Sequence, residues 1–107
     1  MNLPLFKIYW DKNDVEHVNN KITSGEYWCT GKENEIFESK ISEYLEIPYC
    51  ISLNSGGSAL HALMIAHGIG NGDEVIIPSF TFIATAYSPM YTGGKPVFAD
   101  IEDERLG

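Results

Sequence analysis

The feature that most constrains the fold of this chain is a change of hydrophobic period at Pro48. Before Pro48, apolar residues recur at helical spacing, and after it short apolar runs alternate with longer helical patterns. The runs 49–53, 75–77 and 96–99 have the length and composition of buried strands. Strand, helix, strand, helix, strand predicts an α/β fold, with a parallel-type sheet and flanking helices.

The region before Pro48 is predicted to be helical after an extended start. Residues 1–10 carry apolar side chains around a proline, which predicts an extended arm that docks on another surface. Asp11 or Asn13 is expected to cap a first helix, and a second amphipathic helix is expected over residues 33–45. Both helices carry an apolar stripe along one side.

A chain of 107 residues provides at most one domain. We expect an arm and two helices over residues 1–47, followed by a βαβαβ segment over residues 48–100. Three strands make a thin sheet with two open edges, which a complete domain normally covers. The sequence therefore predicts an incomplete portion of a larger domain.

The charge and composition exclude several classes of protein. Seven basic against 15 acidic residues give a formal net charge of −8, which repels a nucleic-acid backbone. No apolar run approaches the roughly 20 residues that span a bilayer, and no signal peptide is recognisable. We therefore expect a cytoplasmic protein that binds neither nucleic acid nor membrane. Cys29 and Cys50 are expected to be buried free thiols, and the spacing of the histidines predicts no metal site.

The best candidate for chemistry is the NSGGS segment at 54–58, between a predicted strand and a predicted helix. The first N–H groups of a helix have no helical partner, so with the helix dipole they form an anion site. Gly56 and Gly57 lack a Cβ, which lets a phosphate approach the backbone closely. Ser55 and Ser58 can add hydroxyl donors. The alternative interpretation is a plain helix N-cap with flexible glycines.

A second candidate is the PSFTF segment at 78–82, which follows another predicted strand. The carboxyl ends of parallel strands meet at one edge of a sheet, so this segment is expected beside NSGGS. A phenylalanine ring there can stack on a planar cofactor, although core packing is the default for a single phenylalanine. No GxxxxGK[ST] or GxGxxG loop opens the predicted helix, so a dinucleotide fold is only weakly supported.

Three stretches of the sequence are TGKENEIFESKISEYL, SLNSGGSALHALMIAHGIGNGDEVIIPSFTFIATA and YTGGKPVFADIE. Their composition and order resemble those of the DegT/StrS-type (DegT/DnrJ) sugar aminotransferases. The resemblance runs from about residue 1 to 105 but covers only the N-terminal part of that family's domain. It implies part of the large domain of a fold-type I enzyme, with pyridoxal 5'-phosphate (PLP) as cofactor. It also implies a nucleotide-linked keto-sugar as substrate, an amino donor such as glutamate, and a homodimer. The expected context is nucleotide-sugar biosynthesis for cell-surface polysaccharide.

The resemblance assigns roles to individual residues. The family's SGT segment matches Ser55, Gly56 and Gly57, whose backbone is expected to contact the cofactor phosphate. Gly57 stands where the family keeps a threonine, and Ser58 can compensate in part for the lost hydroxyl. Phe82 matches the aromatic residue that stacks on the pyridine ring.

The resemblance also shows what this sequence lacks. The family's catalytic lysine, and the acidic residue that pairs with the pyridine nitrogen, match no position here, so no catalytic residue is predicted. Lys95 falls in the family's G-x-KPVF stretch, outside the catalytic role, and Tyr87 stands where asparagine is common. Because transamination needs that lysine as covalent partner and as base, we expect the 107 residues alone to be inactive.

Three functions remain open at this point. The first is part of an aminotransferase, either truncated or split. The second is a non-catalytic cofactor-binding remnant, or an interaction module that pairs with another chain. The third is an unrelated small nucleotide-binding βαβ domain. The adjoining reading frame would distinguish the first from the others.

Overall fold

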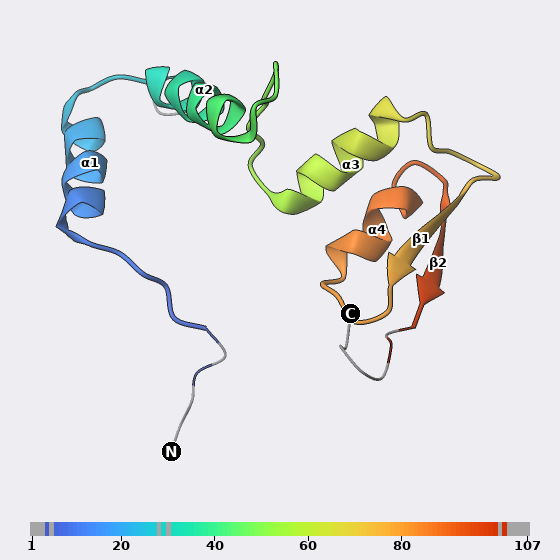
Figure 1. Cartoon of the computed structure of the whole chain (residues 1–107). Helices are drawn as coiled ribbons and strands as arrows, with labels where there is room; N and C mark the ends of the chain where they lie inside the picture. The colour runs from blue at the N-terminus through green and yellow to red at the C-terminus, as the bar shows by residue number, and fades with distance from the viewer. Residues whose placement is uncertain (1–3, 5, 28, 30, 101, 103–107) are drawn as a thin grey trace. The chain divides into compact units, whose positions relative to one another are not determined.

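The computed structural model describes residues 4, 6–27, 29, 31–100 and 102, and the chain divides into two compact units. Unit 1 covers Met1–Ser52 and unit 2 covers Leu53–Gly107. Within the described residues, unit 1 contains helices α1 and α2, and unit 2 contains helices α3 and α4 with strands β1 and β2 (Figure 1).

Helix α1 (Lys12–Thr23) begins at a complete capping box. The Asp11 carboxylate accepts hydrogen bonds from the N–H groups of Asn13 at 2.8 Å and Asp14 at 3.2 Å. In return, the Asp14 carboxylate accepts from the N–H of Asp11 at 2.8 Å. These bonds satisfy backbone donors that have no partner inside the helix. The prediction of an N-cap at Asp11 is confirmed.

Helix α2 (Lys32–Leu45) matches the second predicted helix and ends at Glu46, which adopts a left-handed backbone with φ 54°. The ammonium of Lys21 lies 2.8 Å from carboxylate oxygens of both Glu26 and Glu33, and so links the end of α1 to the start of α2. No side chain of either helix is buried. The predicted apolar stripes are therefore present but uncovered.

The first predicted strand does not form. Residues 49–53 pair with no other strand in the described part of the chain, and Tyr49 and Ile51 are 85% and 78% exposed. The segment is held instead by Glu38 of α2, whose carboxylate accepts the N–H and the hydroxyl of Ser52, both at 2.7 Å. A strand needs a neighbour for its backbone groups and a core for its side chains. Neither is available here, so the βαβαβ prediction is wrong in its first strand.

The centre of unit 2 is a parallel βαβ unit made of three elements: β1 (Glu74–Pro78), α4 (Ala84–Met90) and β2 (Lys95–Ala99). The register pairs Glu74 with Lys95 at the start of the strands and Pro78 with Ala99 at their ends. Helix α4 lies against the two strands (Figure 1). The strands predicted at 75–77 and 96–99, and their parallel pairing, are confirmed.

The core of unit 2 is small and lies between α4 and the strands. Ile77 of β1 is 4% exposed and Ala86 of α4 is 5% exposed, while Pro89 is fully buried. Ser88 is also buried, and its hydroxyl donates to the carbonyl of Thr85 at 3.0 Å. Because this polar group has its hydrogen bond, its burial carries little penalty.

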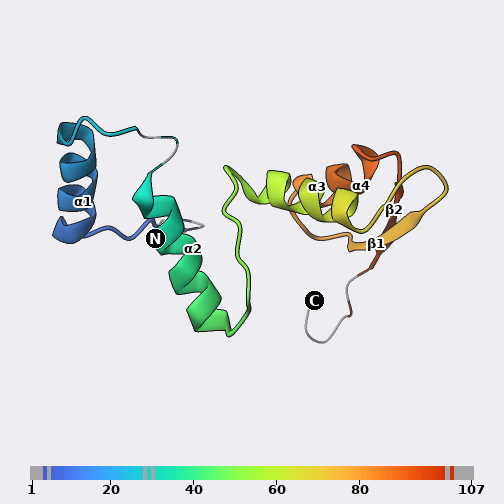
Figure 2. The same cartoon turned by 90° about the horizontal axis from the view of Figure 1, so that it is seen from above.

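Helix α3 (Gly56–Ala66) packs beside α4 in the same unit. Figure 2 shows the two helices together, seen from above. Ser55 caps the start of α3, and Gly68, with φ 71°, follows its end. Glycine adopts this left-handed conformation without strain, which suits the position just after a helix.

Both cysteines are free thiols, but Cys29 is exposed and Cys50 only partly buried. The prediction of burial is wrong for Cys29, because the described residues of unit 1 include no buried side chain that could form a core around it. Among the described residues, no group of three potential metal ligands comes together. None of the described helices has the length and apolar content needed to cross a membrane.

Candidate cofactor site

The first turn of α3 offers two backbone donors without a protein partner. Ser55 Oγ accepts from the N–H of Ser58 at 3.1 Å and donates to Ser58 Oγ at 3.0 Å. No acceptor in the described part of the chain reaches the N–H groups of Gly56 and Gly57. The N-cap and the anion-site interpretations are thus compatible, since the cap uses one amide and leaves two for an anion.

The two glycines keep these amides uncovered. A Cβ on Gly57 would lie 3.6 Å from Ala84 Cβ and 3.8 Å from Ser55 Oγ, and a Cβ on Gly56 would meet nothing within 4 Å. These are ordinary contacts or open space, so protein packing requires glycine at neither position. The geometry fits a phosphate group, which needs close access to the backbone.

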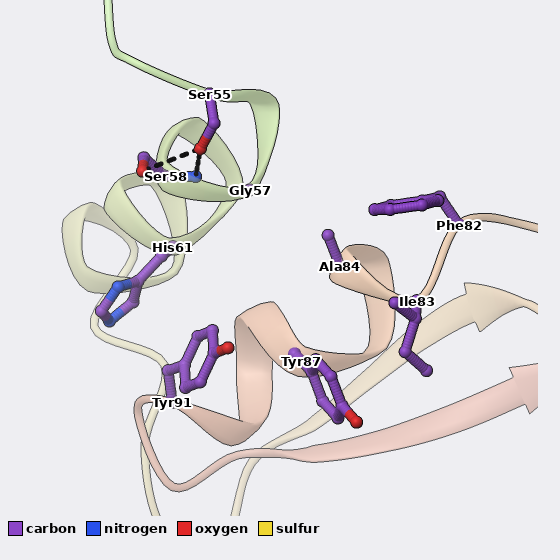
Figure 3. Close-up of a pocket in the computed structure, with 9 residues that line it drawn as sticks. All are labelled: Ser55, Gly57, Ser58, His61, Phe82, Ile83, Ala84, Tyr87 and Tyr91. Atoms are coloured by element: carbon purple, nitrogen blue, oxygen red, sulfur yellow. Dashed lines mark hydrogen bonds between the residues drawn. The ribbon is translucent and has the colours of Figure 1, made fainter.

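An open pocket of about 370 Å³ lies between α3 and α4 (Figure 3). Its lining residues are Ser55, Gly57, Ser58, His61, Phe82, Ile83, Ala84, Tyr87 and Tyr91. The pocket brings together four of the five residues predicted to bind a cofactor, and Gly56 lies outside its lining. Its volume is at the lower end of the range for small-molecule sites.

Phe82 lies between β1 and α4, on the α4 side of the pocket (Figure 3). Its side chain is 78% exposed, so the default interpretation of core packing does not hold within this chain. The described ring contacts do not involve Phe82. An exposed ring beside a pocket is available to stack on a planar ligand.

His61, Tyr87 and Tyr91 complete the lining and were not predicted as site residues. The rings of His61 and Tyr91 are 5.3 Å apart at 52°, and those of Tyr87 and Tyr91 are 6.1 Å apart at 43°. The sequence spacing could have identified these residues, since His61 is three residues after Ser58, and Tyr87 and Tyr91 are four residues apart. Such spacings place side chains on one face of a helix.

The lysine nearest in sequence to this pocket is not placed for covalent chemistry. Lys95, which is the one lysine between residues 53 and 107, donates to Glu74 Oε1 at 2.7 Å. This pair lies at the start of the strands, whereas Phe82 follows the end of β1. The hydrogen bond to Glu74 raises the pKa of the Lys95 ammonium, which keeps it protonated and not nucleophilic.

Comparison with known proteins defines the class to which this fold and pocket belong. Residues 9–106 match the model of the DegT/DnrJ/EryC1/StrS aminotransferase family. The chain therefore belongs to that family, as its motifs indicated, and an unrelated nucleotide-binding domain is ruled out.

The chain is similar to several curated relatives. It is 38% identical over 104 residues to the GDP-perosamine synthase of Vibrio cholerae, a match of 97% of this chain and 28% of that protein. It is 47% identical over 90 residues to the GDP-perosamine synthase of Caulobacter vibrioides, covering 84% of this chain and 24% of that one. It thus spans about a quarter of the length of these relatives.

Solved structures show the same fold. The aminotransferase from Psychrobacter cryohalolentis matches 88% of this chain and 24% of its own, with a TM-score of 0.80 and 33% identity. The PLP form of a Streptococcus pneumoniae protein assigned as a sugar aminotransferase matches 99% of this chain and 27% of its own, with a TM-score of 0.87 and 28% identity. The predicted fold class, part of a PLP-transferase domain, is confirmed.

Proposed function

We propose that this chain supplies the phosphate-binding turn and the ring-stacking side chain of a PLP-dependent aminotransferase. The observation that carries the proposal is the pair of unpartnered amides at Gly56 and Gly57, beside a pocket that also contains Phe82. The acceptor substrate is a nucleotide-linked keto-sugar, and an amino acid such as glutamate is the donor. The names of the relatives support a nucleotide-sugar substrate, because they include a GDP-perosamine synthase and a UDP-sugar aminotransferase.

Backbone amides and a side-chain hydroxyl of the turn would each donate a hydrogen bond to a bound phosphate. The amides of Gly56 and Gly57 donate to it, at the positive end of the α3 dipole. Ser58 Oγ accepts from Ser55, so its own hydrogen remains available to donate to the same anion. The Ser58 hydroxyl then replaces the threonine hydroxyl that is absent at Gly57.

Bound PLP would supply the electron sink for transamination, and Phe82 would hold the plane of its ring. Lys95 is paired with Glu74 at the other end of the strands, so unit 2 offers no lysine of its own to the pocket. The 107 residues alone are then inactive, and the lysine must come from outside them. The whole enzyme works as a cytoplasmic homodimer, and the uncovered apolar stripes of α1 and α2 support a role in such an assembly.

The test is a titration of the isotope-labelled chain with PLP and with inorganic phosphate, followed by nuclear magnetic resonance. Both ligands should shift the amide signals of Gly56, Gly57 and Ser58, and only PLP should shift the ring signals of Phe82. Phe82→Leu should weaken PLP binding by about two- to tenfold, the range of an aromatic contact, and leave phosphate binding unchanged.

Phe80→Leu is the matched control, because Phe80 is 80% exposed but does not line the pocket. Amide shifts spread over the surface, with none at Gly56 and Gly57, would refute the phosphate site. Borohydride reduction that fixes PLP selectively to one lysine of this chain would refute the proposed inactivity.

A further inference from the structure

The two binding groups of the candidate site belong to different elements. The phosphate-binding amides lie in the first turn of α3, and Phe82 lies just before α4. Each group alone recognises only one end of PLP. Their separation, and hence the ability to bind both ends of one ligand, is set by how α3 packs on α4.

Contacts along the two helices hold α3 against α4. No residue of α3 is buried, so no fully enclosed side chain anchors this helix. At the start of the helices Gly57 lies near Ala84, since a Cβ added to Gly57 would lie 3.6 Å from Ala84 Cβ. Further along, the ring of His61 lies against Tyr91, and Tyr87 supports Tyr91 from the same helix (Figure 3).

We propose that His61 and Tyr91 are a positioning pair that fixes the phosphate-binding turn relative to Phe82, an inference that rests on the proposed function. Two weak sites reinforce each other only when their separation matches the ligand before it binds. The contact between the rings supplies this match, because it restrains α3 at a second point beyond Gly57. Tyr87 adds a third ring, which contacts that of Tyr91 with centroids 6.1 Å apart.

If His61 and Tyr91 fix this spacing, removing their contact should lower the affinity for PLP but not the affinity for phosphate. Inorganic phosphate occupies only the turn of α3, so its affinity should not depend on where Phe82 lies. PLP uses both groups, so its affinity should fall when the spacing is lost. The ratio of the two dissociation constants therefore separates an effect specific to PLP from a loss of general stability.

The experiment measures both dissociation constants on the whole chain by magnetic resonance, for His61→Ala and Tyr91→Leu. We expect PLP affinity to fall by about two- to tenfold, the range of an aromatic pair, with phosphate affinity unchanged. His61→Phe and Tyr91→Phe keep a ring at each position and should restore the ratio. Tyr49→Leu is the matched control, since Tyr49 is an exposed tyrosine of unit 1.

Three results would overturn the proposal. An unchanged ratio in both ring-deleting variants would show that the pair sets no spacing. An equal loss for phosphate and PLP, with the amide signals of Ile77 and Ala86 displaced, would show a structural role only. If PLP bound the unmodified chain no better than phosphate, the proposed function would fail first, before any variant was made.

Discussion

Both units contain apolar side chains on amphipathic elements, but the two units bury these side chains to different extents. Unit 1 places the apolar stripes of α1 and α2 on helices that bury no side chain, and its order depends on a capping box, ion pairs and the link from Glu38 to Ser52. Unit 2 encloses a small core around Ile77, Ala86 and Pro89. Local hydrogen bonds can thus define helices, but among the described residues an interior forms where a helix covers a strand pair.

The difference has an energetic consequence. Isolated helices of 12 to 14 residues, the lengths of α1 and α2, are marginal in water. Helical stability in proteins comes mainly from an apolar face that is buried. Unit 1 should therefore gain much of its stability from a surface that covers these stripes, whereas unit 2 should keep its fold by its own contacts.

The sharpest test of this contrast is the same substitution in each unit. Ile77→Ala should lower the free energy of unfolding of unit 2 by about 2–4 kcal/mol, because it removes a buried side chain and leaves a cavity. Ile22→Ala removes the same atoms from a side chain that is 55% exposed, and should change stability by less than about 0.5 kcal/mol. Urea unfolding followed through amide signals of each unit measures both. Equal effects would mean that the stripe of α1 is covered in solution.

A glycine pair gives the next largest expected effect. A Cβ on Gly94 would lie 2.8 Å from Ile69 Cγ2 and 3.3 Å from the carbonyl of Pro89. Gly94→Ala should therefore cost about 1–3 kcal/mol through overpacking. A Cβ on Gly31 would lie 2.6 Å from Glu33 Oε2, but the end of an exposed carboxylate can move aside.

Gly31→Ala is accordingly the control for Gly94→Ala, and should cost less than about 1 kcal/mol, mainly through a poorer N-cap. Thermal unfolding of the two variants distinguishes the cases. If Gly31→Ala proved the more damaging, unit 1 would be more tightly packed than its exposure indicates.

The capping box is the next test, because it should matter most where no core supports the helix. Asp11→Ala removes the acceptor for the N–H groups of Asn13 and Asp14, and should cost α1 about 1 kcal/mol. Asp11→Asn retains a capping oxygen and serves as the control. Amide exchange rates within α1 measure the change, and unaltered rates after Asp11→Ala would show that α1 is held by other contacts.

The sequence predicted the start of α1 because its signal is local: Asp11 caps the N–H groups of its own neighbourhood. The runs at 75–77 and 96–99 form strands because they pair with each other and α4 packs against them. The strand expected at 49–53 failed for the converse reason. A strand depends on a partner and a core, and the local pattern contains no information about either.

The candidate site likewise contains residues that the sequence predicted and a contact that it did not predict. Ser55, Ser58 and Phe82 were identifiable from their place after apolar runs, and the structure brings them to one pocket. Their role in binding a cofactor stays a prediction. The contact between His61 and Tyr91 was not predictable, because it depends on how two separately formed helices pack against each other.

The smallest effect is expected at the link between α2 and the end of unit 1. The N–H and the hydroxyl of Ser52, in that order of importance, donate to Glu38 and hold the pKa of its carboxyl below the ordinary value. A lowered pKa in the folded state means that the carboxylate stabilises the fold above the ordinary pKa of glutamate, about 4.3. This contribution is lost as the pH falls further, through the pKa of the folded state. A pH titration of the Ser52 amide signal should thus show a midpoint below that of a free glutamate.

Glu38→Gln should abolish this titration and loosen residues 49–52, which amide exchange detects. Glu43→Gln, a neighbouring exposed position of α2, should leave the Ser52 signal unchanged. Unit 2 should respond to neither substitution, since its core of Ile77, Ala86 and Pro89 is formed by its own residues. If Glu38→Gln left the Ser52 signal titrating as before, the link would not exist in solution, and residues 49–52 would have to be held by another contact. Unit 1 would then lose one of the few interactions that distinguish it from two tethered helices.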